Sequence, residues 1–187
     1  MKQALLLIDI QNDYFEGGTM TLVNAKLASE NAKLVLAKFR SQGWPVFHVQ
    51  HIATKKEATF FLPETVGAEI HKNVTPITGE KLVVKHFPNS FRETDLLAGL
   101  QENGITDLLI LGMMTHMCID ATTRAAKDLG YSCTVVGDAC ATRDLEINGV
   151  KVSAADVHNA FLAALNSTYA NIISTTDLLN KNYNFNI

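Results

Sequence analysis

The sequence predicts an α/β protein with three layers, in which helices cover both faces of a six-stranded, mainly parallel sheet. Short apolar runs alternate along the chain with longer stretches of helical periodicity, which is the pattern of parallel βαβ units. The connections are short enough to favour parallel strands with right-handed crossovers. A chain of 187 residues, 47% of them hydrophobic and 19% charged, fits a single folded domain over 1–187.

The first strand and the first helix have clear signals. The apolar run at 4–8 predicts a strand that ends just before Asp9. A helix is expected over 24–40, because Asn24 can cap it and because a stripe at helical spacing is formed by Leu27, Leu34, Val35, Ala37 and Lys38. Gly43 supplies its stop.

The later elements alternate in the same manner, with Thr94 and Ser153 as expected helix caps and Gly104 and Gly130 as stops. The polar segment 52–80 is longer than a usual connection, so it is a candidate lid, pocket wall or part of a subunit interface. Strands are expected at 44–50, 81–84, 107–111, 132–136 and 170–173, and helices at 94–103, 119–130, 153–166 and from Thr176 onward.

Charge and composition argue against several classes of partner and location. The formal net charge is −3, the pI is about 6.0 and no Lys/Arg cluster is present, so nucleic acid is not an expected partner. Asp9 interrupts the N-terminal apolar run too early for a signal peptide or a membrane span, which favours a cytoplasmic protein. Cys118, Cys133 and Cys140 lack the spacing of a disulfide framework or a zinc site and are expected to be free thiols.

Three polar residues follow or approach the carboxyl ends of predicted strands, where open parallel sheets bind their ligands. Asp9 follows the first strand, Lys85 follows the third, and Cys118 lies near the start of the helix after the fourth. Taken singly, each has an ordinary explanation as a turn-capping aspartate, a solvated lysine or a core cysteine. Together they supply a base, a cation and a nucleophile. A helix N-terminus and a neighbouring Lys85 would lower the pKa of Cys118.

Three segments carry a resemblance to a known family. The stretch IDIQNDYFEGGTM at 8–20 resembles the N-terminal signature of the isochorismatase-like hydrolases. Lys85 with its trailing Ser90, Phe91 and Thr94 resembles their lysine segment, and GMMTHMCIDATTRAA at 112–126 resembles their nucleophile segment. The resemblance runs from about residue 4 to about residue 138.

The resemblance implies a catalytic triad of Asp9, Lys85 and Cys118. It also implies a non-proline cis peptide between Met113 and Met114, and an oxyanion hole formed by the amides of Met114 and Cys118. The family's strand order, 3-2-1-4-5-6, would place the third strand away from the first, so Lys85 must reach back across the top of the sheet. Related proteins form dimers or tetramers, and apolar helix faces such as 161–165 agree with a homo-oligomer.

The branch of the family is indicated by what surrounds the triad. Nicotinamidases of the family hold a divalent metal through an aspartate and histidines after the second strand, whereas this sequence has His48, His51 and His71 without that aspartate. No metal or other cofactor is therefore expected. True isochorismatases lack the nucleophilic cysteine, so Cys118 argues against hydrolysis of a vinyl ether. The remaining branch hydrolyses amide, carbamoyl and related acyl–nitrogen bonds of small molecules.

In this interpretation Asp9 accepts the thiol proton, Lys85 stabilises the thiolate, and Cys118 forms a covalent acyl-enzyme. Three alternatives stay open: an isochorismatase-type vinyl ether hydrolase, a non-catalytic protein on the same fold, and a thiol redox sensor in which Cys140 resolves an oxidised Cys118. The candidate substrate-binding residues are Gln11, Phe15, Phe60, Phe61 and His116.

Overall fold

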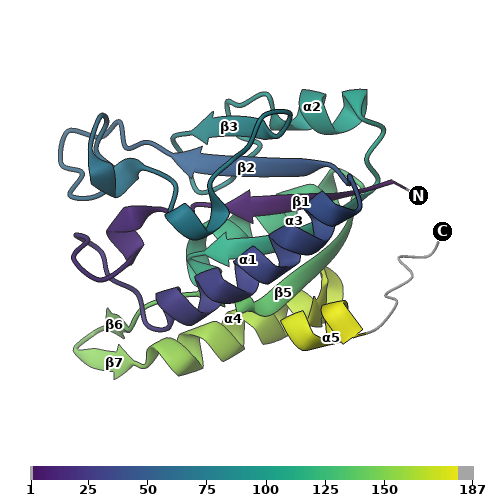
Figure 1. The fold of residues 1–187 in the computed structure, drawn as a ribbon. Coiled ribbons are helices and arrows are strands. Elements are labelled where there is room, and N and C mark those ends of the chain that lie inside the picture. The colour runs from purple at the N-terminus through teal and green to yellow at the C-terminus, as the bar shows by residue number, and fades with distance from the viewer. Residues whose placement is uncertain (1, 181–187) are drawn as a thin grey trace.

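The computed structural model describes residues 2–180, and Figure 1 shows strands and helices alternating along the chain. The strands are β1 (Gln3–Ile8), β2 (Val46–His51), β3 (Lys81–Lys85), β4 (Asp107–Met113), β5 (Ser132–Ala141), β6 (Leu145–Ile147), β7 (Val150–Val152) and β8 (Asn171–Ile173). The helices are α1 (Ala25–Ser41), α2 (Leu96–Glu102), α3 (Asp120–Asp128), α4 (Ala154–Thr168) and α5 (Thr175–Asn180), with a π-helical segment, η4 (Thr115–Ile119), immediately before α3.

Six strands form one sheet in the order β3-β2-β1-β4-β5-β8, and each neighbouring pair is parallel. This confirms the predicted order, since β8 is the strand expected at 170–173. Helices α1 and α5 pack together, as do α3 and α4, and Figure 1 shows α1 and α3 on opposite faces of the sheet. Because all six strands run in the same direction, their carboxyl ends lie along one edge, on the side of the 52–80 segment.

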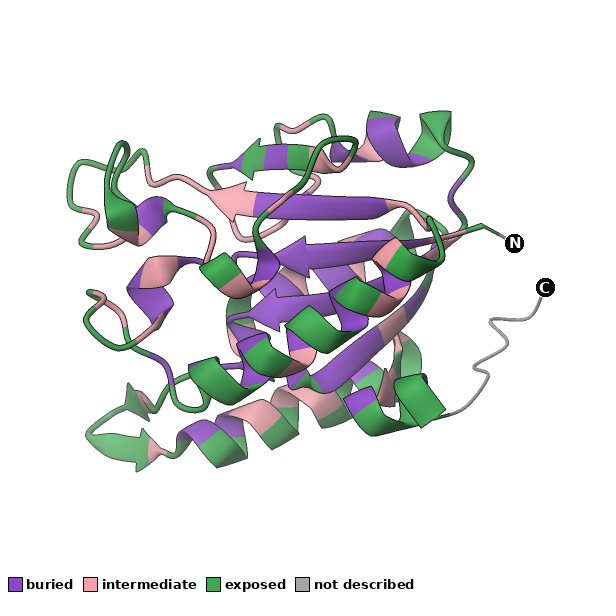
Figure 2. Cartoon of the chain, in the orientation of Figure 1, coloured by how far each residue is buried: buried purple, intermediate pink, exposed green. Residues whose placement is uncertain are grey.

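The core lies around the two central strands. From Ala4 to Ile8 and from Leu108 to Met113 every residue is buried (Figure 2), as expected for parallel strands that are covered on both faces. Helix α1 buries a face that includes Ala32, Val35 and Phe39. Of the predicted stripe only Val35 is buried: Leu27 is 56% and Leu34 is 51% exposed, Ala37 is exposed and Lys38 is half-buried.

Helix starts were predicted with mixed success. Ser153 caps α4 as expected, and its hydroxyl accepts a hydrogen bond from the amide of Asp156. Asn24 does not cap α1 through its side chain; it takes a left-handed conformation with φ of 61° instead. Among the described residues, no helix combines the length and the apolar character that a membrane span requires.

The β6–β7 hairpin was not predicted, although its signal is present. Asn148 and Gly149 both have positive φ, at 53° and 75°, and they connect the two antiparallel strands. An Asn-Gly pair between alternating apolar residues is a strong hairpin signature, because both turn positions require positive φ. Strand β5 is also longer than expected and continues to Ala141.

Candidate active site

Asp9 and Lys85 form a fully buried ion pair at the carboxyl ends of β1 and β3. Both side chains are 0% exposed, and the Lys85 ammonium lies 2.8 Å from the Asp9 carboxylate. Strand β2 lies between β1 and β3, with His51 paired in register with Lys85. The long lysine side chain therefore reaches back across β2, and its Nζ also donates a hydrogen bond of 3.0 Å to the carbonyl of Pro88.

The Asp9 carboxylate has few partners for a buried charge. Apart from the Lys85 ammonium and the Cys118 thiol, neither of its oxygens has a hydrogen-bond partner among the described residues. Buried carboxylates are usually well supplied with hydrogen-bond donors. An under-satisfied carboxylate in a dry site is a feature of functional positions, because it keeps acceptor capacity for another molecule.

Cys118 lies in the π-helical segment η4, next to this pair, and is 4% exposed. The carbonyl of Met114 accepts hydrogen bonds from the amides of Met117 and Ile119, the residues on either side of Cys118. The Met113–Met114 peptide bond is cis, at the position that the resemblance implies. Close packing against β1 requires the preceding glycine, since a Cβ on Gly112 would lie 2.0 Å from the carbonyl oxygen of Ile8.

The expectation that Cys118 has a lowered pKa is wrong. Burial raises the pKa of the Cys118 thiol above its ordinary value, and the negative charge of Asp9 raises it further, against the opposing effect of Lys85. Burial acts to lower the pKa of Lys85, but the interaction with the negative charge of Asp9, and after it the interaction with Cys118, outweighs burial and raises that pKa. The resting site therefore holds a neutral thiol beside a charged lysine.

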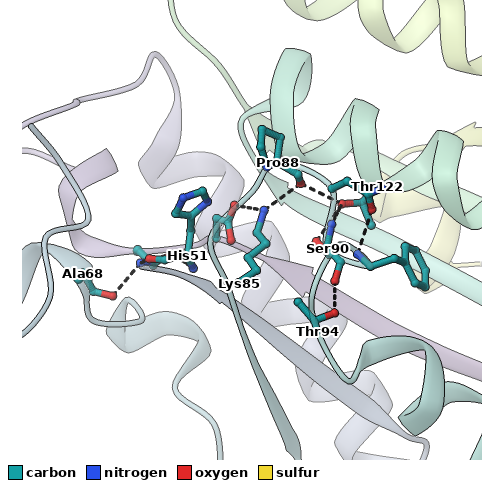
Figure 3. A network of polar contacts seen from close by, with 11 residues as sticks. His51, Ala68, Lys85, Pro88, Ser90, Thr94 and Thr122 are labelled. Carbon is teal, nitrogen blue, oxygen red and sulfur yellow. Dashed lines mark hydrogen bonds and ion pairs between the residues drawn. The ribbon is translucent and has the colours of Figure 1, made fainter. Parts of the chain in front are cut away.

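The loop that follows Lys85 is fastened to α3, as Figure 3 shows for the labelled residues. Thr122 of α3 accepts a hydrogen bond of 3.0 Å from the amide of Ser90, and the two hydroxyls lie 2.8 Å apart. Thr94 donates to the carbonyl of Ser90 over 2.6 Å, and Thr122 donates to that of Pro88 over 3.3 Å. Because Pro88 also receives the lysine ammonium, these contacts hold Lys85 relative to the helix that follows Cys118.

Gln11 has a different environment from the one predicted for it. Its side chain is 0% exposed and donates to the carbonyls of His51 and Ala68 over 2.8 and 2.7 Å. Its side-chain oxygen accepts from the amide of His51 over 2.8 Å. All these contacts are to the backbone, so Gln11 holds the end of β2 against the 52–80 segment and presents no free group to a substrate.

The aromatic pocket candidates are unequally accessible. Phe61 is only 1% exposed and packs against Tyr14 with ring centroids 4.7 Å apart, so it belongs to the core. Phe60 and Phe15 are half-buried and are therefore accessible enough to contact a substrate. His116 is also half-buried, and its Nδ1 lies 2.5 Å from the hydroxyl of Thr142.

Tyr14, which lies near the thiol, and Arg143, which lies near Tyr14 and His116, were not predicted. Tyr14 is 1% exposed, and its pKa is raised first by burial and then by the negative charges of Cys118 and Asp9. Arg143 is exposed. Its positive charge opposes the rise in the pKa of Tyr14 and adds to the lowering of the pKa of His116. The sequence could have indicated Tyr14 as a site residue, because it lies within the IDIQNDYF motif. No local pattern indicates Arg143.

The three histidines that were considered as metal ligands lie in three different environments. His48 is buried and contacts Glu80 over 2.8 Å, and His71 stacks on Phe15 with ring centroids 3.8 Å apart. His51 alone joins the catalytic candidates: one ligand atom each from Asp9, His51 and Cys118 lie within 4.8 Å of one another. Neither His48 nor His71 belongs to this group.

All three thiols are buried and free, as predicted. Burial raises the pKa of Cys133 and of Cys140 to about 12 each. A redox-sensing thiol needs exposure and a low pKa, so these environments weigh against the sensor alternative.

Comparison with known proteins gives the family. The isochorismatase domain profile matches residues 3–177. The chain is 54% identical to the uncharacterised isochorismatase family protein YddQ of Bacillus subtilis, covering 96% of this chain and 99% of that protein. A candidate isochorismatase hydrolase from Oleispira antarctica superposes with a TM-score of 0.91 at 53% identity, covering 96% of this chain and 97% of that one.

A relative with a named activity is the streptothricin hydrolase of Streptomyces noursei. It is 32% identical over 168 residues, which are 90% of this chain and 58% of that protein. The family profile, the relatives and the fold agree with one another. The chain belongs to the isochorismatase family and is a hydrolase of that family.

Proposed function

We infer that this protein is a cysteine hydrolase that cleaves a C–N bond of an amide or carbamoyl compound through a covalent intermediate on Cys118. One observation carries the proposal: a buried thiol lies beside a carboxylate that has no other well-aligned hydrogen-bond partner and beside a charged lysine. These groups are a nucleophile, its base and a stabilising cation. Membership of a hydrolase family makes water the second reactant.

The raised pKa of Cys118 gives Asp9 its first task. Because the resting thiol is neutral, it needs a base within reach at the moment of attack. Asp9 accepts the thiol proton while the sulfur forms a bond to the carbonyl carbon. Lys85 stabilises the charge throughout, since its own raised pKa keeps it protonated.

The later steps return each group to its starting state. The amides of Met114 and Cys118 stabilise the oxyanion, and Asp9 passes its proton to the leaving nitrogen as the C–N bond breaks. A water molecule, deprotonated by Asp9, then attacks the thioester. The C–S bond breaks, the sulfur recovers the proton, and the acid product leaves. No electron transfer is involved, and the proposed steps use only side chains and water.

A substrate panel tests the reaction class. The purified protein is assayed against small amides, carbamoyl compounds, streptothricin and isochorismate, with Cys118→Ala and the buried-thiol control Cys133→Ala assayed in parallel. We expect turnover of an acyl–nitrogen compound that is lost in Cys118→Ala and kept in Cys133→Ala. Hydrolysis of isochorismate that survives in Cys118→Ala would show a proton-transfer enzyme and contradict the proposal.

A further inference from the structure

His51 is a polar side chain near the proposed catalytic groups that the reaction leaves unused. Its imidazole has no hydrogen bond to another described residue, and Figure 3 shows it projecting beside Lys85. Its nearest ligand-type neighbours are a carboxylate oxygen of Asp9 and the sulfur of Cys118, with all three atoms within 4.8 Å of one another. An imidazole, a carboxylate and a thiol form a ligand set that suits zinc.

We propose that Asp9, His51 and Cys118 form a binding site for Zn²⁺, and that the bound ion holds the enzyme in a reversible inactive state. The inactivation half of this proposal rests on the proposed function, whereas the site itself does not. The site differs from the histidine set of the nicotinamidase type considered from the sequence, because neither His48 nor His71 takes part.

The charge state and position of each donor favour coordination. Asp9 is 0% exposed, and neither oxygen has a well-aligned hydrogen-bond partner among the described residues, so lone pairs remain for an ion. His51 is half-buried, and its imidazole has no hydrogen bond among the described residues, so a ring nitrogen is available to bind metal. Gln11 hydrogen-bonds both the amide and the carbonyl of His51 and so fixes the backbone that carries this ring.

The geometry provides three ligands and leaves one coordination position open. Zinc bonds of about 2.0 to 2.3 Å require the three side chains to close slightly around the ion. The thiol loses its proton to solvent as the S–Zn bond forms, so charge and atoms balance without an oxidant. Three protein ligands with an open fourth position form a zinc site that a water molecule or another small ligand completes.

Lys85 sets the strength of the site. Its ammonium lies 2.8 Å from Asp9, and a divalent ion beside it experiences like-charge repulsion. The occupied state is therefore weaker than a dedicated zinc site, and the ion exchanges with solution. While it is bound, Cys118 has no free thiol to attack a carbonyl and Asp9 has no free oxygen to accept a proton, so zinc and substrate exclude each other.

The test measures metal binding directly in the full-length protein after chelator treatment and dialysis. Co²⁺ is added as a spectroscopic probe, because a thiolate ligand gives a charge-transfer absorption that oxygen and nitrogen ligands do not. Zn²⁺ affinity is then measured by competition. We expect one ion per chain and a charge-transfer band that disappears in Cys118→Ser, with circular dichroism verifying that the variant is folded.

Three further variants test which residues contribute to the metal site. His51→Ala should weaken Zn²⁺ binding by about tenfold or more, whereas the matched control His71→Ala should leave it unchanged. Lys85→Met should strengthen binding, because the competing cation is gone. Absence of binding by the folded wild-type protein, or affinities unchanged in both Cys118→Ser and His51→Ala, would overturn the site.

Turnover measured with and without Zn²⁺ separates this proposal from the proposed function. We expect inhibition that substrate relieves and that a chelator reverses. Full activity with the ion bound would overturn the inactive state. Binding through the three residues in a protein that hydrolyses no acyl–nitrogen compound would contradict the proposed function and leave the zinc site standing, whereas an active enzyme that binds no zinc would remove the site alone.

Discussion

Two ionic clusters, one partly buried and one fully buried, lie at opposite ends of β3 and differ in how many hydrogen bonds their carboxylates receive. At the amino end, Glu80 accepts hydrogen bonds from both Nε and Nη2 of Arg40, from His48 and from the amide of Ile77, all within 3.0 Å. At the carboxyl end, the Asp9 carboxylate has an ammonium at 2.8 Å and no well-aligned hydrogen bond from the described residues. The Glu80 carboxylate is therefore well supplied with hydrogen-bond donors, and the Asp9 carboxylate is not.

The difference indicates that the Glu80 cluster contributes to stability, whereas the Asp9–Lys85 pair serves catalysis. The contacts to Glu80 outweigh the opposing effect of burial and lower its pKa to about 2, so its negative charge stabilises the fold. Asp9 and Lys85 are dehydrated without that compensation, and a buried pair of this kind is weak evidence for stability. Residues that violate the rules of polar satisfaction are frequent at functional sites, and Asp9 is such a residue beside the thiol.

The largest expected effect is on catalysis at the carboxyl end. Cys118→Ala should lower kcat/KM for an acyl–nitrogen substrate by about 10⁴-fold or more, and Asp9→Asn should do nearly the same, because the triad acts as a unit. The Cys118→Ala/Asp9→Asn double variant should lose scarcely more than either single variant. Steady-state kinetics of the three proteins measures this, and near-additive losses would show that the two residues act independently.

The next largest expected effect is a difference in how much the two clusters contribute to the stability of the protein. Replacing the whole catalytic pair with apolar residues, in Asp9→Leu/Lys85→Met, should leave stability unchanged or raise it by about 1 to 4 kcal/mol, because the dehydrated charges are removed together. Glu80→Gln should instead cost about 1.5 to 3 kcal/mol, because hydrogen bonds to a charged group are lost.

Urea unfolding of both variants checks this contrast, with the exposed Glu57→Gln as control. Activity gives the opposite ranking: Glu80→Gln should retain turnover at temperatures where it stays folded, and the double variant should have none. If Asp9→Leu/Lys85→Met destabilised the protein more than Glu80→Gln, the comparison would be contradicted.

A smaller effect concerns acid stability at the amino end. The lowered pKa of Glu80 means that the unfolded chain takes up its proton at higher pH, so this stabilisation is complete above about pH 4.5 and is lost as the pH falls toward 2. His48 has a pKa lowered by burial from 6.5, so it adds a loss in the same direction as the pH falls below 6.5. Melting temperatures between pH 7 and pH 3 should therefore fall less steeply in Glu80→Gln than in the wild-type protein. Parallel curves would mean that Glu80 does not contribute to acid sensitivity.

The smallest expected effect is that of chelation. Because the proposed reaction uses only side chains and water, exhaustive treatment with a chelator should leave turnover of the substrate at or above its starting value, and nicotinamide should be a poor substrate. Loss of activity that added zinc or iron restores would contradict this reading of both the mechanism and the zinc site.

Much of the fold follows from local signals, as the paired strands and the Ser153 cap illustrate. The α1 stripe was misjudged at Leu27 and Leu34, because which face of a helix is buried depends on its orientation against β5 and not on periodicity alone. For the site, the order of the residue types was enough to select Asp9, Lys85 and Cys118 as candidates. The sequence does not contain the degree of dehydration, and for that reason the direction of the Cys118 pKa shift was mistaken.

Gln11 and His51 are two further residues whose environments could not be predicted from the sequence. A glutamine in a family motif was expected to contact substrate, yet its amide is taken up by the backbone of His51 and Ala68. His51 was considered together with His48, although the two project into different environments three residues apart in β2. Both outcomes depend on long-range packing of the 52–80 segment, which no local pattern specifies.

The most direct test is to trap the covalent intermediate. The enzyme is mixed with a turned-over amide or carbamoyl substrate, quenched rapidly in acid and analysed as intact protein by mass spectrometry, followed by peptide mapping. We predict a mass increase equal to the acyl group, located on the peptide that contains Cys118 and absent from Cys118→Ala. Turnover by a Cys118→Ala enzyme at near wild-type rate, or an acyl group located on another residue, would contradict the assignment of Cys118 as the nucleophile.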